Sequence, residues 1–290
     1  MDYPKKVKIV EVGPRDGLQN DKRIIPTEDK VRFIDLLTEA GLSEIEAGSF
    51  VHPRWVPQLA DTTEVYRRIK KREGVSYPVL VPNLKGLSRA IEAGVREIAV
   101  FTAASESFNK KNINMSVDES LEVIREILLS ARREHLRVRG YVSTCFACPY
   151  EGRMQTAQVS SVIKKLFDLG VDEISLGDTI GSAVPTEVEV LLESVTEKEK
   201  IPKEKIAVHF HNTRGTALAN ILVSIQMGIS IIDSSAGGLG GCPYAPGASG
   251  NVATEEVLYM LHGMGIETGV SLEKVVEASK TLRAFSEGMM

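Results

Sequence analysis

The sequence has few aromatic residues and no excess of positive charge, and both shortages limit the partners it can bind. Phe, Trp and Tyr make up 6% of the 290 residues, and the formal net charge is -4 at pH 7. Nucleic-acid-binding surfaces need clustered cations with interleaved aromatic residues, and the sequence has no such stripe. No apolar run reaches the roughly 18 residues of a membrane-spanning helix, and the start of the chain lacks a signal-peptide pattern. We therefore expect no nucleic-acid partner and no membrane partner.

Cysteine is also scarce. The three cysteines, Cys145, Cys148 and Cys242, are an odd number in a chain of this length, which fits a reducing compartment better than a disulfide framework. Cys145 and Cys148 form a C-x2-C pair, but no second pair supplies the two further ligands of a structural zinc site. We expect these two thiols to be ordinary buried side chains and the protein to be cytoplasmic.

The sequence shows no linker, no low-complexity segment and no glycine-rich phosphate loop. The first strand-like segment, residues 7–13, runs into GPRDGLQN, which lacks the glycine spacing of a dinucleotide-binding fingerprint. An open doubly wound sheet would need such a loop. With 43% apolar residues and no internal boundary, we expect a single catalytic domain over residues 1–290.

Four segments of the chain follow one pattern. In each, an amphipathic stretch ends at a glycine, and an apolar, strand-like stretch begins two or three residues later. Glycine in this place is typical of a helix C-terminus with positive φ, and the branched apolar residues behind it are typical of a buried parallel strand. The four glycines are Gly41, Gly94, Gly170 and Gly228.

Four more strand-like segments lie between these joints, each followed by helical periodicity. They cover residues 7–13, 77–82, 137–143 and 206–211. Eight strands that alternate with helices over about 260 residues predict an α/β protein with a closed (β/α)8 TIM barrel. Near the end of the chain, SLEKVVEASKTLRAFSEG predicts an additional C-terminal helical segment.

In such a barrel the active site lies at the C-terminal ends of the strands. His209 and His211 end the segment 206–211, and because side chains alternate along a strand, both imidazoles face the same way. Asp16 follows the first strand-like segment and adds a carboxylate. Two histidines with a carboxylate and further oxygen ligands suit Mg²⁺ or Mn²⁺ better than zinc. The alternative is a pair of hydrogen-bonded histidines without a metal.

Further polar and reactive side chains are expected at the same end of the barrel. After the eighth strand-like segment comes GGLGGCPYAPGASGN (237–251), in which six glycines flank the thiol of Cys242. Such a loop can move and can bring its backbone close to a substrate; the alternative is a structural turn with an incidental cysteine. Four other candidates lie in or just after strand-like segments: Arg15, Glu46, Ser49 and Asp178.

The segment SESFNKKNINMS (105–116) is polar and rich in amides. One interpretation is a solvated loop that opens a helix, with Ser116 as the N-cap and Glu119 as its capping-box partner. That interpretation leaves four residues unexplained, and two of these are lysines that could meet phosphate groups at the rim. The four candidate substrate-binding residues are Lys110, Lys111, Asn112 and Asn114.

Taken in order along the chain, the motifs resemble those of 3-hydroxy-3-methylglutaryl-CoA (HMG-CoA) lyases. The resemblance covers essentially the whole chain. The wider group of metal-dependent barrel lyases and Claisen-type synthases shares the Arg-Asp and His-x-His elements, whereas the cysteine loop is similar to that of the lyases. The motifs are EVGPRDGLQN, SFVHPRWVPQLAD, SESFNKKNIN, ACPYEG, ISLGDTIG, HFHNTRGTALAN and GGLGGCPYAPGASGNVATE.

The resemblance implies a metal-dependent retro-Claisen cleavage of HMG-CoA to acetyl-CoA and acetoacetate, a reaction of ketone-body and leucine catabolism. It implies an acyl-CoA substrate, whose phosphates would meet the two lysines, and a homodimer. It also implies that a divalent metal, Mg²⁺ or Mn²⁺, is held by Asp16, His209, His211 and Asn251.

The resemblance also implies roles for the other candidates. Arg15 would neutralise the thioester oxygen as it becomes an enolate, which suits a side chain that stays charged. Glu46 and Asp178 would be acid-base or positioning groups. Cys242 would donate a proton from its loop, since a neutral thiol with a pKa of about 8.5 can do so and be regenerated by solvent.

Two positions depart from the family pattern. Asn212 stands where an aspartate is usual after the second histidine, and Gly48 stands where a threonine is common. An amide at position 212 could weaken the orientation of an imidazole, and we expect Gly48 to open space near Glu46. Either change could alter the acyl group that is accepted.

Three alternatives to an HMG-CoA lyase stay open on the sequence. The first is a lyase for a longer 3-hydroxy-3-alkylglutaryl-CoA, with the same chemistry in a larger pocket. The second is a synthase that joins acetyl-CoA to an α-keto acid, which we expect to lack the cysteine loop. The third is a barrel that binds ligands without catalysis, which the filled set of ligand and acid-base positions disfavours.

Overall fold

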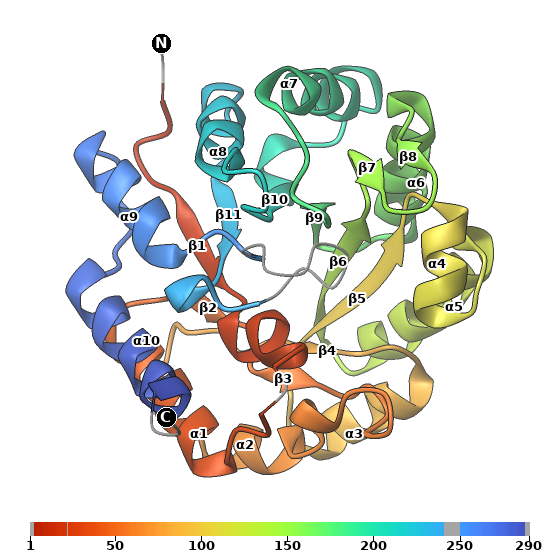
Figure 1. Cartoon of the computed structure of the whole chain (residues 1–290). Coiled ribbons are helices and arrows are strands. Elements are labelled where there is room, and N and C mark those ends of the chain that lie inside the picture. Colours follow the sequence, from red (N-terminus) through yellow and green to blue (C-terminus); the bar gives the residue numbers. More distant parts are fainter. Residues whose placement is uncertain (1–2, 22, 241–249, 288–290) are drawn as a thin grey trace.

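Eight parallel strands surrounded by helices form a barrel in the computed structural model, which describes residues 3–21, 23–240 and 250–287 (Figure 1). The hydrogen-bonded order of the strand segments is β2-β1-β11-β10-β9-β6-β5-β4-β3. β2 (Glu44–Ile45) and β3 (Gly48–Ser49), at the two ends of this order, are parts of one strand. The backbone N–H of Glu46 donates to the carbonyl of Glu11 (2.9 Å), and that of Ala47 donates to the carbonyl of Pro78 (2.8 Å). The sheet is therefore closed, and the prediction of a TIM barrel is confirmed.

The other barrel strands lie close to their predicted positions. They are β1 (Lys8–Glu11), β4 (Val79–Leu80), β5 (Glu97–Ala103), β6 (Arg137–Ser143), β9 (Glu173–Asp178), β10 (Ile206–Phe210) and β11 (Ile231–Ser234). The four predicted helix-to-strand joints are also confirmed, because each glycine has the positive φ that a side chain would oppose. The φ values are 98° at Gly41, 80° at Gly94, 91° at Gly170 and 90° at Gly228.

Eight helices cover the barrel and bury their apolar stripes against the outward faces of the strands. Phe33 and Leu37 on α1, for example, are fully buried in the main core. The helices are α1 (Thr27–Glu39), α2 (Thr62–Arg68), α3 (Leu84–Glu92), α5 (Val117–Arg133), α6 (Thr156–Leu169), α7 (Pro185–Glu193), α8 (Ala217–Gln226) and α9 (Thr254–Gly263). None of the helices in the described ranges is both long and apolar enough to cross a membrane.

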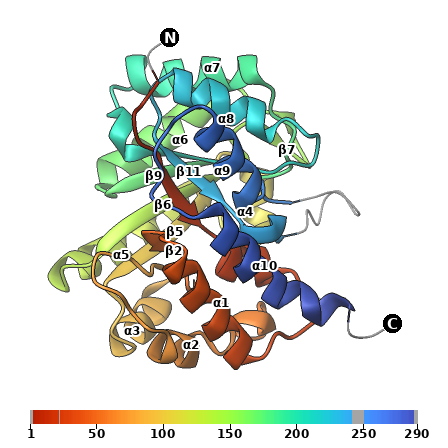
Figure 2. The ribbon, with the colours of Figure 1, turned by 90° about the vertical axis from the view of Figure 1, so that its left-hand side faces the viewer.

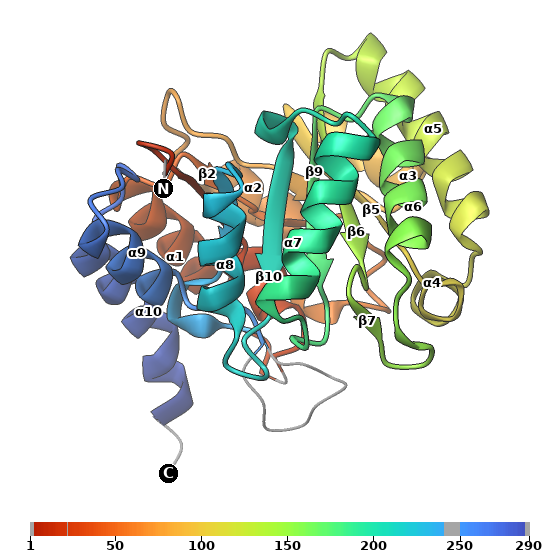
Figure 3. The ribbon, with the colours of Figure 1, turned by 90° about the horizontal axis from the view of Figure 1, so that it is seen from above.

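Two elements lie outside this regular pattern. The predicted C-terminal helix is present as α10 (Leu272–Glu287), which lies between α1 and α9 (Figure 2). A short helix, α4 (Glu106–Ile113), and a hairpin of β7 (Ala147–Cys148) and β8 (Gly152–Arg153) lie at one end of the barrel (Figure 3). They follow the C-terminal ends of β5 and β6, and therefore flank the end where the site was predicted.

Candidate active site

A short helical turn directly after β1 carries Arg15 and Asp16. The turn, η1 (Gly13–Gly17), is closed by the backbone N–H of Asp16, which donates to the carbonyl of Val12 (2.7 Å). A Cβ at Gly17 would lie 2.8 Å from both Leu239 Cβ and Ser235 Oγ. Glycine at this position therefore lets the turn pack directly against the segment that follows β11.

The turn brings Asp16 beside the two histidines of β10. Asp16, His209 and His211 each offer one potential ligand atom, and these three atoms lie within 4.8 Å of one another. His209 Nε2 is 3.9 Å from Asp16 Oδ2, and the Asp16 side chain is 24% exposed, so the cluster is open on one side. Asn251 Nδ2 donates to Asp16 Oδ2 (2.9 Å). The structure thus brings the four predicted ligands together.

The donor set at this cluster fits a divalent metal. His211 Nδ1 is buried and has no hydrogen-bond partner within the described part of the chain, so the hydrogen-bonding capacity of this ring is not filled by the protein. Two imidazoles and a carboxylate, with an open side for water or substrate oxygen, suit Mg²⁺ or Mn²⁺. These residues could therefore hold such a metal.

The charges of Asp16 and His211 agree with metal binding. Burial opposes ionisation of Asp16, but the neighbouring Arg15 and the two imidazoles hold its pKa well below the usual range. Burial and the adjacent His209 lower the pKa of His211 to about 4, so this ring is neutral at pH 7. Burial lowers the pKa of His209, but the hydrogen bond to Asp233 and the charge of Asp16 outweigh burial and raise the pKa above its usual value. A metal would therefore compete with a proton on this ring. Carboxylate and neutral imidazole are the metal-binding forms of these side chains.

Asp233 on β11 is a site residue that the sequence analysis missed. It is fully buried in the barrel interior, in register with His209, and its Oδ2 lies 3.2 Å from His209 Nδ1. The sequence does contain a signal for it. Asp233 is a lone carboxylate in the segment IIDSS, two residues after the start of a predicted buried strand. Buried charges are rare without a partner, and so its position called for one.

Arg15 is held in place by two carboxylates. Its Nε donates to Glu46 Oε2 (2.7 Å), its Nη1 donates to Asp16 Oδ1 (2.6 Å), and its guanidinium lies over the ring of Tyr141. Tyr141 also donates from its hydroxyl to Glu46 Oε2 (3.2 Å). Burial raises the pKa of Glu46 despite the nearby Arg15, and its Oε1 is buried without a partner in the described residues. Arg15 and Glu46 are therefore a bonded pair that lies beside the candidate metal-binding residues.

Asp178 ends β9 but lies on the other face of the sheet. It is in register with Phe210, whose ring packs against Phe146 on the helix side (5.9 Å between centroids), and registered neighbours share a face. Its two carboxylate oxygens accept from the backbone N–H groups of Ser182 and Ala183 (3.1 and 3.0 Å). Burial raises its pKa to about 6. These contacts hold the loop that precedes α7.

Ser49 and Gly48 lie against the start of α2. The Ser49 hydroxyl accepts from the backbone N–H of Val51 (3.1 Å), and the backbone N–H of Ser49 donates to Thr62 Oγ1 (3.0 Å). A Cβ at Gly48 would lie 2.6 Å from the same Thr62 oxygen. The expectation that Gly48 opens space near Glu46 is therefore wrong, because Thr62 already fills that space.

The other departure from the family pattern, Asn212, contacts the next helix. Its Oδ1 accepts from the backbone N–H of Ala217 at the start of α8 (3.3 Å). His209 Nδ1, on the neighbouring part of the site, lies 3.2 Å from Asp233 Oδ2.

The segment 105–116 is mostly helical and not a loop. The capping box of Ser116 and Glu119 is confirmed, with Glu119 N–H to Ser116 Oγ at 3.1 Å. Asn114 has φ 57° and ends α4, which explains an amide there, since asparagine tolerates the left-handed conformation. The four candidate substrate-binding residues are all exposed on or just after α4: Lys110, Lys111, Asn112 and Asn114.

The expectation for the first two cysteines is confirmed, since Cys145 and Cys148 are free and buried. Burial raises the pKa of Cys145 to about 12, so its thiol is unreactive at neutral pH. Cys242, the predicted proton donor, lies outside the described residues.

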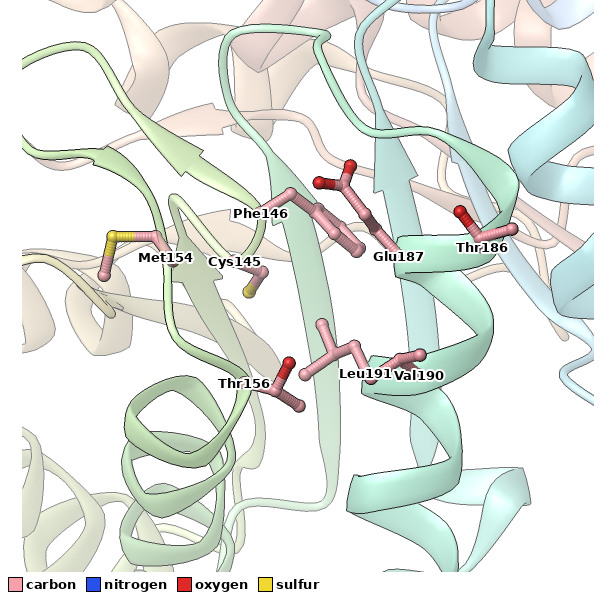
Figure 4. Close-up of a pocket in the computed structure, with 8 residues that line it drawn as sticks. All are labelled: Cys145, Phe146, Met154, Thr156, Thr186, Glu187, Val190 and Leu191. Carbon is pink, nitrogen blue, oxygen red and sulfur yellow. The ribbon is translucent and has the colours of Figure 1, made fainter.

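A pocket of about 270 Å³ lies on the outside of the barrel, away from the metal cluster (Figure 4). Three elements surround it: the segment after β6, the start of α6, and α7. Phe146, Met154 and Leu191 are among the residues that line it. Phe146 separates it from Phe210 on β10. The reaction chemistry predicted above needs the charged cluster inside the barrel, so this pocket is not the active site.

Known proteins resemble the chain over nearly its whole length. The HMGL-like family matches residues 6–282. The mitochondrial hydroxymethylglutaryl-CoA lyase of Bos taurus is 57% identical over 276 residues, which cover 95% of this chain and 84% of the bovine protein. The hydroxymethylglutaryl-CoA lyase of Pseudomonas aeruginosa has a TM-score of 0.96 and 51% identity, covering 99% of this chain and 95% of that one.

A third match has ligands bound. It is an HMG-CoA lyase from Acinetobacter baumannii in complex with coenzyme A and 3-methylmalate, with a TM-score of 0.92 and 38% identity, covering 98% of this chain and 92% of that one. The resemblance predicted from the motifs is therefore confirmed, and the chain belongs to the HMGL-like family.

Proposed function

We propose that this carbon–carbon lyase cleaves HMG-CoA to acetyl-CoA and acetoacetate by a metal-dependent retro-Claisen reaction. The observation that carries the proposal is the joint position of Arg15 and the cluster of Asp16, His209 and His211 at the open end of the barrel. Family membership over almost the whole chain, and lyase relatives at more than half identity, support it.

The metal is proposed to lie between Asp16, His209, His211 and Asn251. When bound, Mg²⁺ or Mn²⁺ would act as a Lewis acid that makes the tertiary hydroxyl of the substrate more acidic. Asn251 now points Nδ2 at Asp16, so its Oδ1 would have to turn toward the ion. A Cβ at Gly240 would lie 2.7 Å from Asn251 Nδ2, so a glycine there leaves room for this amide.

Arg15 is proposed to stabilise the enolate that forms at the thioester. Its Nε and Nη1 are bound by Glu46 and Asp16, and in the described ranges no hydrogen bond involves Nη2. This nitrogen is left to donate to the thioester oxygen. Because two carboxylates already orient the guanidinium, little reorganisation is needed when the negative charge develops.

Glu46 is the carboxylate best placed to hold a proton. Its Oε1 is buried and unpartnered within the described residues, and burial raises its pKa. Asp178 has both oxygens committed to the loop before α7, which supports a positioning role over an acid-base role. Cys242 is proposed, from the resemblance alone, as the group that protonates the enolate carbon.

A first experiment measures acetoacetate after incubation with HMG-CoA and Mg²⁺, alongside a panel of longer 3-hydroxy-3-alkylglutaryl-CoA substrates. We expect Asp16→Ala and His209→Ala to lower both metal content and turnover by more than about 100-fold, beyond what loss of an outer hydrogen bond costs. The matched control is Asp172→Ala, a carboxylate distant from the cluster on the loop before β9. Full metal occupancy in Asp16→Ala or His209→Ala would remove that residue from the ligand set.

Alkylation tests the role of Cys242 and the synthase alternative. Because Cys145 and Cys148 are only 3% and 2% exposed, a small alkylating reagent should modify the folded enzyme at Cys242. We expect inactivation, protection by a bound substrate analogue, and a turnover loss of orders of magnitude in Cys242→Ser with metal binding unchanged. An active Cys242→Ser variant, or inactivation traced to Cys145 or Cys148, would disprove the proton-donor role. A synthase would stay active after alkylation.

Three remaining expectations complete the proposal. We place the protein in the cytoplasm on its cysteine usage, which cell fractionation can test against a mitochondrial location. We expect a homodimer, which sedimentation can test. We also expect residues 1–290 to unfold as one catalytic domain, in a single cooperative transition.

A further inference from the structure

Asp233 connects the proposed metal-binding residues to the charged interior of the barrel. The side chain is 1% exposed and lies beside His209 on the neighbouring strand. Its Oδ2 accepts from Ser175 Oγ (2.8 Å), and its Oδ1 accepts from Arg139 Nη2 (2.6 Å). A second guanidinium nitrogen, Nη1, lies 3.2 Å from Oδ2. The carboxylate is thus bonded on both oxygens by groups inside the barrel.

This bonding determines which nitrogen of His209 carries the hydrogen. Asp233 is the carboxylate of a buried ion pair, because Arg139 Nη2 lies 2.6 Å from its Oδ1 and Ser175 Oγ donates to its Oδ2. An ionised carboxylate only accepts hydrogen bonds. His209 Nδ1, at 3.2 Å from Oδ2, must therefore be the donor, and the lone pair of the neutral ring lies on Nε2, the nitrogen that faces Asp16.

We propose that Asp233 is a positioning residue that fixes His209 in the Nδ1–H tautomer and directs Nε2 at the metal, with Arg139 holding Asp233 in place. The inference rests on the proposed metal site. Carboxylates that accept from the second nitrogen of a metal-bound histidine orient the ring and increase its basicity as a ligand.

Arg139 can hold Asp233 because it is itself anchored from the other side. Its Nε donates to Glu173 Oε1 (2.7 Å), and its Nη1 donates to the hydroxyl of Tyr141 (2.7 Å). Arg139 is among the largest fully buried side chains of the protein. A charged group of this size, buried and bonded at three nitrogens, leaves Asp233 little freedom to turn away from His209.

The first test is the affinity of the metal alone, measured by calorimetry with Mg²⁺ and Mn²⁺ in the absence of substrate. We expect Asp233→Asn to bind both ions about 10–100-fold more weakly. Because Asp233→Asn leaves Arg139 buried without its charge partner, the double variant Arg139→Gln/Asp233→Asn is measured as well, and we expect the same loss. The matched control is Ser175→Ala, which removes one hydrogen bond from Asp233 but keeps its charge, and we expect a change of less than about threefold.

The second test reads the tautomer directly in the unmodified protein. In the Mg²⁺-loaded enzyme, ¹⁵N nuclear magnetic resonance of the histidines should show His209 with its hydrogen on Nδ1, assigned by comparison with His209→Gln. A hydrogen on Nε2, or undiminished metal affinity in Asp233→Asn or in the double variant, would overturn the inference while leaving the lyase proposal standing. Failure of the unmodified protein to bind metal or to cleave HMG-CoA would instead refute the proposed function.

Discussion

The two ends of the barrel both bury charged side chains, but they use them differently. At the N-terminal end, five residues that each begin a strand form a paired network: Lys8, Glu44, Glu97, Arg137 and Glu173. Each charge there lies within 3.3 Å of an opposite one. At the C-terminal end, His211 Nδ1 and Glu46 Oε1 have no described partner. The ion pairs at the N-terminal end stabilise the fold, although Glu44 Oε1 there is also buried without a described partner, whereas the unpartnered atoms of His211 and Glu46 border the candidate metal site.

Arg139 and Asp233 join these two regions. Arg139 contacts Glu173, a member of the paired network, and Asp233, which contacts the proposed metal ligand His209. A single guanidinium therefore contacts carboxylates of both regions. The comparison predicts that substitutions at the open end reduce catalysis with little loss of stability, and that substitutions at the closed end do the reverse.

The largest effect is expected for Arg15→Lys at the open end. Lysine keeps the charge but lacks the planar fork that binds Glu46 and Asp16 and leaves one nitrogen for the substrate. We expect kcat/KM to fall by about 10²–10³, with the folded structure retained. The control is Arg89→Lys on α3, whose guanidinium packs over Phe50 far from the cluster. Near-normal turnover in Arg15→Lys would show that positive charge alone suffices.

A smaller effect, on stability, is expected at Glu11, which lies between the barrel and α9. Its Oε1 accepts from the N–H groups of Gly13 and Ala236 (2.8 Å each), and its Oε2 accepts from Thr254 (2.7 Å). Burial raises its pKa from 4.5 to about 7. Since the folded pKa is the higher one, its contribution to stability is complete below pH 4.5 and is lost as the pH rises to about 7.

Glu11→Gln tests this pH dependence. Glutamine keeps the shape and the acceptor oxygen without a charge, so we expect the variant to exceed the parent in free energy of unfolding at pH 8 by on the order of 3 kcal/mol. Below pH 4.5 the difference should vanish. Urea unfolding of both proteins from pH 4 to pH 8 measures it, and parallel pH profiles would contradict the assignment.

A loss of about 2 kcal/mol in unfolding free energy is expected for Arg137→Met at the closed end. Arg137 pairs with Glu44, Glu97 and Glu173, but a third of its side chain is exposed, so solvent screens part of the effect. kcat/KM per folded molecule should not change. A selective loss of activity or metal affinity, with stability intact, would show that the two ends are not separated in the way the structure suggests.

The smallest effect is expected at the rim. Lys110→Ala/Lys111→Ala should raise KM for the acyl-CoA a few-fold and leave kcat unchanged, because exposed charges contribute about 0.2–1 kcal/mol each and are screened by salt. The control is Lys164→Ala on α6, a partly exposed lysine that pairs with Asp168. A KM that is unchanged at low ionic strength would remove both lysines from the CoA-binding surface.

Sequence reasoning was accurate where a local pattern has one structural solution. The glycines at 41, 94, 170 and 228 end helices with positive φ, and the alternation in IAVHFH places both histidines on one face. It failed where a contact joins distant segments. Thr62, on α2, occupies the space beside Gly48. Asp233, on another strand, is the partner of His209 Nδ1. Neither pairing leaves a periodic signal in the sequence.

By itself, the sequence determined the barrel, its eight strands and the end at which the chemistry lies, because hydrophobic period and glycine placement act over a few residues. The family followed from its ordered motifs. Only the tertiary structure decided that Asp178 faces the helix layer, and that Asp233 contacts both the proposed metal ligand His209 and Arg139. These outcomes depend on the register between parallel strands and on the burial of charge, and both arise only when the barrel closes.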